Sequence, residues 1–192
     1  MEDKKISILG INGSPHKDGG TVQMLNEALE GAKKHGAEVK MINLFDYNMK
    51  LYHGDYDKKP CEESLRLFKE MEKYDGYIFA TPVHWLAPSS LMKIFLDNMT
   101  YLEVEDFQME GKVFGVLAHC LEDGAFQAAT YLASVFGHMG MVCPPYAAVL
   151  RNKNLKTDED TDYMNKDSAL LGKNVVIMVE MLKKEKPVWD YD

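Results

Sequence analysis

Short apolar runs alternate with amphipathic stretches along most of this 192-residue chain. The apolar runs are continuous, as in strands buried on both faces, and the amphipathic stretches carry apolar residues at helical spacing. The predicted strands are residues 6–12, 38–44, 76–81, 112–118 and 141–149, and the predicted helices are 22–35, 62–74, 89–101, 124–138 and about 164–184. This alternation predicts an α/β fold in which helices cover both faces of a parallel sheet.

The last predicted strand contains Pro144 and Pro145. Proline is tolerated mainly on edge strands, so this strand is expected at an edge, as in a five-stranded sheet of order 2-1-3-4-5. In that order, ligands bind beyond the carboxyl ends of the first and third strands. The loops at residues 14–21 and 81–88 are both expected there, so the sequence predicts one binding crevice between them.

The first of these loops reads GSPHKDGGT and leads straight into a helix. Ser14 and Thr21 offer hydroxyl groups, His16 and Lys17 offer positive charge, and two glycines allow the backbone to approach a ligand closely. A phosphate group is favoured at such a helix N-terminus. The loop matches neither the Walker A pattern nor the dinucleotide fingerprint. The alternative is a polar turn in which Thr21 caps the helix and no ligand binds.

The second loop, TPVHWLAPSS, and the third, AHCLEDGA, are expected at the same edge of the sheet. Backbone N–H groups from Val83 to Trp85 are suited to the polar edge of a planar heterocycle, and the indole ring to its apolar face. The alternative is a turn with a core tryptophan. Gly124 permits close approach in the third loop. His119 and Cys120 are adjacent in a strand and point to opposite faces, which disfavours a nucleophilic pair.

The motifs GSPHKDGGT and TPVHWLAPSSLMKIFLDNM, with the glycine-bearing third loop, resemble the NADPH-dependent FMN reductase family over about residues 5–150. The resemblance implies a flavodoxin-like three-layer sandwich formed by a single domain, residues 1–192, with bound FMN and with NADPH or NADH as co-substrate. By position it assigns FMN binding to Ser14, His16, Gly20, Thr21, Val22, Pro82, Val83, His84, Trp85, His119 and Gly124.

The chain departs from the family pattern at several positions. His16 stands where the family usually has arginine, so FMN is expected to bind more tightly as the pH falls through the range where histidine gains charge. His84 replaces the usual tyrosine, and the third loop has fewer glycines. Related iron-sulfur flavoproteins carry clustered cysteines after the second strand, where this chain has only Cys61. No metal site is therefore expected.

Composition excludes several classes of partner. The net charge of −8 and the lack of a dense basic run disfavour nucleic acid and anionic membranes. No apolar segment approaches the roughly 18 residues that a membrane helix needs. Three scattered cysteines and the absence of a signal peptide indicate a cytoplasmic protein. Because Trp85 and its apolar neighbours would need cover, a homodimer or homotetramer is expected.

The resulting hypothesis is an FMN-dependent NAD(P)H oxidoreductase that passes electrons to a small acceptor such as a quinone or a free flavin. In such an enzyme the flavin carries the redox chemistry, so no catalytic side chain is assigned. Two alternatives remain, namely a flavodoxin-like electron carrier and a flavodoxin-like binding or regulatory module without catalysis. Oxidation of NAD(P)H would separate the first hypothesis from the carrier, and a yellow colour would separate both from a module without flavin.

Overall fold

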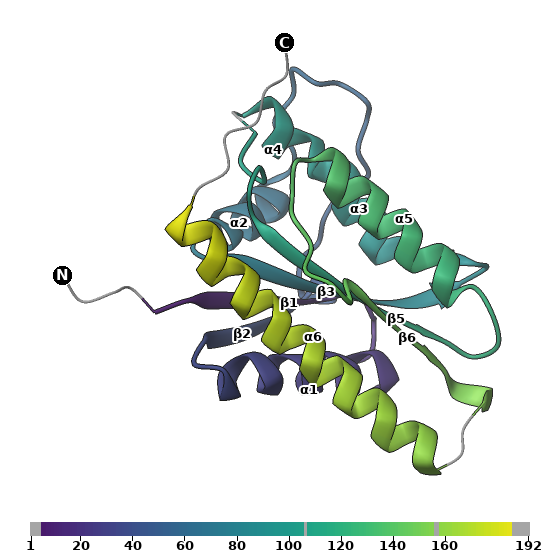
Figure 1. Ribbon diagram of the computed structural model, residues 1–192. Coiled ribbons are helices and arrows are strands. Elements are labelled where there is room, and N and C mark those ends of the chain that lie inside the picture. Colours follow the sequence, from purple (N-terminus) through teal and green to yellow (C-terminus); the bar gives the residue numbers. More distant parts are fainter. Residues whose placement is uncertain (1–4, 106, 156–157, 186–192) are drawn as a thin grey trace.

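A central sheet of parallel strands organises the computed structural model, which describes residues 5–105, 107–155 and 158–185 (Figure 1). The parallel strands follow the order β2 (Glu38–Asn43), β1 (Ser7–Asn12), β3 (Gly76–His84), β5 (Val113–Cys120) and β6 (Ala148–Asn152). A two-residue strand, β4 (Ala87–Pro88), pairs antiparallel with the end of β3. Apart from β4, the predicted parallel order is confirmed.

Helices cover both faces of the sheet, as the alternating pattern predicts (Figure 1). One face is covered by α1 (Gly20–Lys34) and α6 (Asp158–Lys184). The other face is covered by α2 (Glu62–Met71), α3 (Ser90–Asn98), α4 (Thr100–Val104) and α5 (Ala125–His138). Short 3-10 helices follow β2 and β6 at Leu44–Asp46 and Lys153–Leu155. The arrangement is the expected flavodoxin-like three-layer sandwich.

Alternation along the strands divides the core into two layers. In β1, Ile8 packs with the α1 and α6 residues, whereas Leu9 and Ile11 pack with the residues of the opposite layer. All three side chains are fully buried. Because β1 lies between β2 and β3, its residues can be apolar in both directions. This explains the continuous apolar run that predicted the strand.

The last strand is the clearest error in the predicted elements. It was predicted at residues 141–149, but β6 begins at Ala148, and Pro144 and Pro145 lie in the loop before it. Within the predicted range, Val142 makes only an isolated bridge to Val113. Proline has no N–H group to donate to a ladder, so pairing starts only after the two prolines. The predicted edge position is nevertheless correct.

Three other boundaries also differ. Residues 151–162 are polar and acidic, which predicts a connector between the last strand and the last helix. The structure instead has the end of β6 and the start of α6 there, and residues 156–157 lie outside the described part of the chain. The helix predicted at 89–101 divides into α3 and α4. The loop predicted at 81–88 is a β-hairpin formed by β3 and β4. Within the described residues, no helix has the length and apolar character needed to cross a membrane.

Candidate functional site

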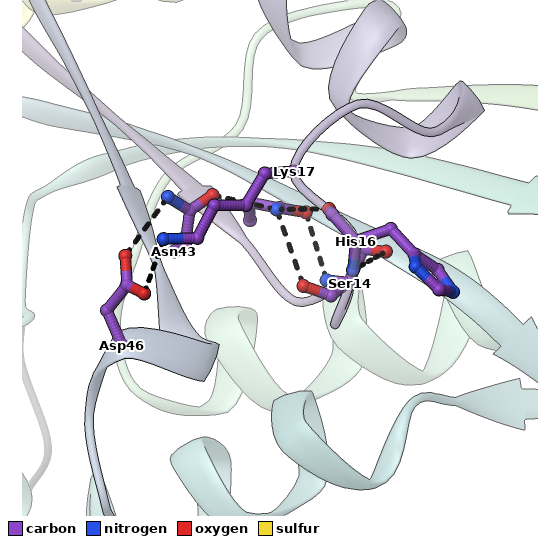
Figure 2. Close-up of polar contacts among 6 residues, drawn as sticks. Ser14, His16, Lys17, Asn43 and Asp46 are labelled. Carbon is purple, nitrogen blue, oxygen red and sulfur yellow. Dashed lines mark hydrogen bonds and ion pairs between the residues drawn. The ribbon is translucent and has the colours of Figure 1, made fainter.

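Asn12, the last residue of β1, organises the first loop from inside the protein. Its side chain is fully buried. Its amide nitrogen donates to Asn43 Oδ1 at 2.9 Å and to the carbonyl oxygens of Ser14 and His16 at 3.4 and 3.3 Å. Its Oδ1 accepts the Ser14 N–H at 2.9 Å, and Ser14 Oγ accepts the His16 N–H at 3.1 Å. Figure 2 shows this network, which fixes the loop without any ligand.

The first loop ends at the N-terminus of α1. Gly19 is the N-cap residue, and no side chain caps the helix there. The first N–H groups of a helix have no partner within the helix, so they remain available to an anion. Thr21 and Val22 are 3% and 5% exposed. Val22 can therefore contact a ligand only through its backbone. Since Thr21 lies inside the first turn, the alternative in which it caps the helix is wrong.

A close contact joins the first loop to the end of β5. A Cβ atom added to Gly20 would lie 2.5 Å from Nε2 of His119. The His119 imidazole therefore rests against the first turn of α1, and any residue larger than glycine at position 20 would displace it. The structure thus brings together two predicted site residues that are 99 positions apart in the sequence.

Of the two basic residues of the first loop, Lys17 is paired with a carboxylate and His16 is exposed. Lys17 Nζ lies 2.6 Å from Oδ1 of Asp46, a residue of the 3-10 helix that follows β2 (Figure 2). The hydrogen bond from Lys17 holds the pKa of Asp46 below its usual range. His16 is exposed. Lys17 was predicted to supply positive charge to a phosphate, but in this structure Asp46 already neutralises that charge.

The hairpin of β3 and β4 carries the residues that the sequence predicts to contact a planar heterocycle, which we call the ring-side residues. Val83 pairs with Pro88 and His84 pairs with Ala87, which leaves a two-residue turn at the tip. The turn residues, Trp85 and Leu86, have positive φ angles of 49° and 64°. The Trp85 side chain is 100% exposed, so the alternative of a core tryptophan is wrong. Non-glycine residues in this conformation are strained, and such strain concentrates at functional sites.

Ser89 connects the hairpin to the first loop. Its buried hydroxyl donates to the carbonyl oxygen of Gly13 at 2.6 Å and accepts the Met92 N–H at 3.1 Å, which caps α3. The Ser89 N–H donates to Thr81 Oγ1 at 3.0 Å. The Gly13 N–H donates to the carbonyl oxygen of Ala80 at 2.7 Å. These bonds hold the two loops at a fixed separation.

The third loop packs against the hairpin through Gly124. This residue has a φ angle of +93° and is the N-cap of α5. A Cβ atom added there would lie 2.7 Å from Leu86 Cα. Next to His119, Cys120 is 4% exposed, and burial raises the pKa of its thiol. A protonated thiol that belongs to the opposite core layer is not a nucleophile partner for His119.

The predicted site residues therefore fall into three groups at one edge of the sheet. Ser14, His16, Gly20, Thr21 and Val22 lie in the first loop and α1. Pro82 and Val83 are half-buried in β3, while His84 and Trp85 are exposed toward the hairpin tip. His119 and Gly124 join the third loop to the other two groups.

Sequence reasoning missed Asn12, Ser89 and Arg151. Asn12 ends an apolar strand and Ser89 begins a helix, and asparagine and serine favour turns and caps, so there was a weak signal for these two residues. Arg151, in β6, is 3% exposed and gave none, because it was placed in a solvated connector. Among the described residues, no group of three or more His, Cys, Asp or Glu side chains is placed to hold a metal ion.

The arrangement fits a phosphorylated planar ligand. The uncapped helix N-terminus and the close approach at Gly20 suit a phosphate group. The hairpin and the glycine of the third loop offer backbone groups and an exposed indole to a flat ring.

Comparison with known proteins gives relatives that carry flavins. An iron-sulfur flavoprotein of Methanocaldococcus jannaschii is 29% identical over 119 residues, which are 59% of this chain and 61% of that protein. An iron-sulfur flavoprotein of Archaeoglobus fulgidus is 25% identical over 75% of this chain and 74% of its own length. The 8-demethyl-8-aminoriboflavin-5'-phosphate synthase of Streptomyces davaonensis is 25% identical over 67% of this chain and 55% of its own length.

Solved structures share the fold at lower identity. The crystal structure of RosB with bound 8-demethyl-8-formylriboflavin-5'-phosphate matches with a TM-score of 0.80 and 20% identity, over 95% of this chain and 82% of that one. The apo form of the NADH:FMN oxidoreductase EMOB matches with a TM-score of 0.65 and 21% identity, over 88% of this chain and 89% of that one.

The model of the NADPH-dependent FMN reductase family matches residues 6–155, which contain all three loops of the site. The match confirms the resemblance carried by the loop motifs, and FMN is the cofactor that it assigns. With the sheet order, the loops at its carboxyl edge and this match all in agreement, the chain belongs to the NADPH-dependent FMN reductase family.

Proposed function

We propose that the protein uses bound FMN to take electrons from NADPH or NADH and to pass them to a small acceptor, such as a quinone or a free flavin. The observation that carries this proposal is the junction of the first loop with the hairpin. The loop that leads into the uncapped helix N-terminus is joined to the hairpin by hydrogen bonds of Ser89 and Gly13, and Asn12 fixes the loop itself. A phosphate subsite and a ring subsite are thereby fixed relative to each other.

The chain's own residues have binding and positioning roles in this proposal. FMN supplies the hydride and electron chemistry when it is bound. The N–H groups of Gly20, Thr21 and Val22 bind its phosphate, and Asn12 keeps the loop that precedes them in place. Backbone N–H groups of the hairpin face the polar edge of the ring, where negative charge is favoured by such donors. No side chain of the site is assigned as a nucleophile or a general acid.

An anaerobic titration tests the proposal. The purified full chain is loaded with FMN, and its visible spectrum is recorded while NADH or NADPH is added in separate experiments. We expect bleaching of the flavin absorbance with at least one of the two, followed by reoxidation on addition of a quinone. A protein that binds FMN but is reduced by neither nucleotide would be an electron carrier. A protein that binds no FMN would contradict the proposal altogether.

We also propose that a second copy of the chain covers the ring side of the site. Four apolar side chains there are strongly exposed: Trp85 at 100%, Leu86 at 53%, Leu121 at 60% and Phe126 at 70%. The Gly124 contact places the hairpin tip directly against the third loop, so these residues belong to neighbouring segments. Contiguous apolar surface of this kind is typical of an interface, and symmetric dimers are the commonest solution.

Light scattering on the FMN-loaded protein tests this arrangement. We expect a dimer or tetramer mass for the wild type and a monomer mass for Phe126→Ser. Phe45→Ser is the matched control, because Phe45 is also strongly exposed (59%) but lies in the 3-10 helix after β2. A monomeric wild type at micromolar concentration would show that the proposed second copy is wrong.

A further inference from the structure

The two arginines of the chain lie in opposite environments. Arg66 is an exposed residue of α2 and forms an ion pair with Glu63 at 2.7 Å. Arg151, on the edge strand β6, is 3% exposed, and its Nε is buried without a hydrogen-bond partner in the part of the chain that the structure describes. Removing a charge from water without a partner costs free energy. Arg151 therefore calls for an anionic ligand.

Arg151 lines a cavity of about 300 Å³ at the carboxyl edge of the sheet. A water molecule occupies roughly 30 Å³ of the liquid, so the cavity holds a phosphate group together with several waters. Arg151 on β6 is paired with His119 on β5, and both residues line the cavity. The remaining charged and close-approach residues of its wall are Asp18, Gly19, Gly20 and Lys153.

The charges around this cavity favour an anion. Arg151 and Lys153 contribute two positive charges against the single negative charge of Asp18, which is exposed. The N-terminus of α1 adds the positive end of its dipole, because Gly19 and Gly20 form part of the wall and no side chain caps the helix. A guanidinium group matches the oxygens of a phosphate with two parallel hydrogen bonds.

We infer that this cavity is a phosphate-monoester site in which Arg151 supplies the permanent positive charge. Arg151 is not among the residues to which the family resemblance assigns FMN binding. The phosphate of FMN, the 2'-phosphate of NADPH and inorganic phosphate share the required chemistry. The inference rests on the proposed function where it concerns FMN, because the cavity shares Gly20 with the proposed phosphate subsite. Phosphate binding by Arg151 can nevertheless be measured whether or not NAD(P)H is oxidised, so the two can fail separately.

Thermal unfolding of the full chain, before and after loading with FMN, provides the first test. Inorganic phosphate is titrated at constant ionic strength into wild type, Arg151→Met and Arg66→Met. Before FMN loading, phosphate should raise the melting temperature of wild type and Arg66→Met, because a ligand that binds only the folded state stabilises it. Phosphate should leave the melting temperature of Arg151→Met unchanged. Without phosphate, Arg151→Met should melt at or above the wild-type temperature, since an unpaired buried charge has been removed.

A purely structural role for Arg151 gives a different pattern. Arg151→Met would then melt below wild type by the same amount with and without phosphate, and that result overturns the inference. If Arg151→Met fails to fold, Arg151→Lys replaces it, because it keeps the charge and loses the planar fork. We expect Arg151→Lys to bind phosphate more weakly than wild type, and equal binding by the two proteins would also overturn the inference.

Pairs of ligands that differ by one phosphate group identify which phosphate the cavity binds. A loss of about 10-fold or more in FMN affinity, with riboflavin affinity unchanged, would assign the site to FMN, because that is the size of a lost charge-assisted hydrogen bond. A similar loss for NADPH but not NADH, measured on FMN-loaded protein, would assign it to the dinucleotide. Loss of inorganic phosphate binding alone would assign it to free phosphate. If Arg151→Met matches Arg66→Met with every ligand, the inference is wrong.

Discussion

The first loop, residues 13–19, and the hairpin, residues 82–88, flank the same site but are stabilised in different ways. Buried Asn12 holds the first loop through three hydrogen bonds to its backbone, and a fourth joins Asn12 to the Asn43 side chain. The hairpin instead has two residues with positive φ angles at its tip, and no other residue in the described part of the chain covers the Trp85 side chain. Ser89 joins the two segments at their base.

This difference separates the roles of the two segments. The first loop is held by internal hydrogen bonds, so we expect little ordering entropy to be lost if a phosphate group binds there. The hairpin keeps apolar surface exposed, and that surface gains stability only when a ring or another chain covers it. We therefore expect changes in the first loop to affect both stability and FMN binding, and changes at the hairpin tip to affect binding alone.

Asn12→Ala should have the largest effect. The substitution leaves the Ser14 N–H and two carbonyl oxygens without their partner, and each unsatisfied buried group costs about 1–3 kcal/mol. We expect a loss of about 3 kcal/mol in the free energy of unfolding and at least a 10-fold loss of FMN affinity. Chemical denaturation and fluorescence titration measure the two quantities. Asn26→Ala, at an exposed position of α1, is the control and should change neither. Unchanged FMN affinity in Asn12→Ala would show that the loop is not preorganised by this residue.

Gly124→Ala tests the contact between the hairpin and the third loop. The alanine would have to keep the left-handed backbone conformation of Gly124, and its Cβ atom would clash with the Leu86 backbone. We therefore expect a loss of about 1–3 kcal/mol in the free energy of unfolding. Gly137→Ala is the control on the same helix, because a Cβ atom at position 137 meets nothing within 4 Å. Thermal unfolding should show destabilisation only for Gly124→Ala. Equal melting temperatures would mean that the hairpin moves freely away from the third loop.

Trp85→Ala should separate binding from stability. Because the side chain is fully exposed, the free energy of unfolding is expected to change by less than about 0.5 kcal/mol. FMN affinity should fall about 3- to 10-fold, the size of an aromatic contact.

Tryptophan fluorescence gives an independent measure of the same contact. The other tryptophan, Trp189, lies outside the described residues, so Trp189→Phe leaves Trp85 as the sole tryptophan. Its emission should be quenched as FMN is added. A lack of quenching by bound FMN would place the ring away from the hairpin tip.

Asp46→Asn should have the smallest effect. The Lys17–Asp46 pair is exposed, so its loss should not measurably change the melting temperature. The released Lys17 is then free to approach a bound phosphate, and FMN affinity should rise slightly. Because Lys17 lowers the pKa of Asp46, the pair persists as the pH falls through the usual carboxyl range and breaks only at lower pH. A fall in FMN affinity for Asp46→Asn would show that the pair itself positions the loop.

Local patterns were sufficient for much of the fold and for part of the site. Apolar runs located β1, β2, β3 and β5, and the glycine-rich first loop correctly marked the start of α1. The same method misplaced β6, since the apolar residues before Pro144 look like a strand although the two prolines prevent pairing. It also missed the hairpin, because the tip residues Trp85 and Leu86 are not the asparagine and glycine that usually mark a two-residue turn.

The sequence by itself determined the order of strands and helices, the edge of the sheet that carries the site and the family to which the chain belongs. Those features depend on periodicity and on loop motifs a few residues long. Only the tertiary structure decided that His119 rests on Gly20, that Lys17 is neutralised by Asp46 and that Arg151 is buried beside an open cavity. Each of these contacts joins segments that are distant in the chain, and their partners are selected by the packing of strands and helices rather than by any local pattern.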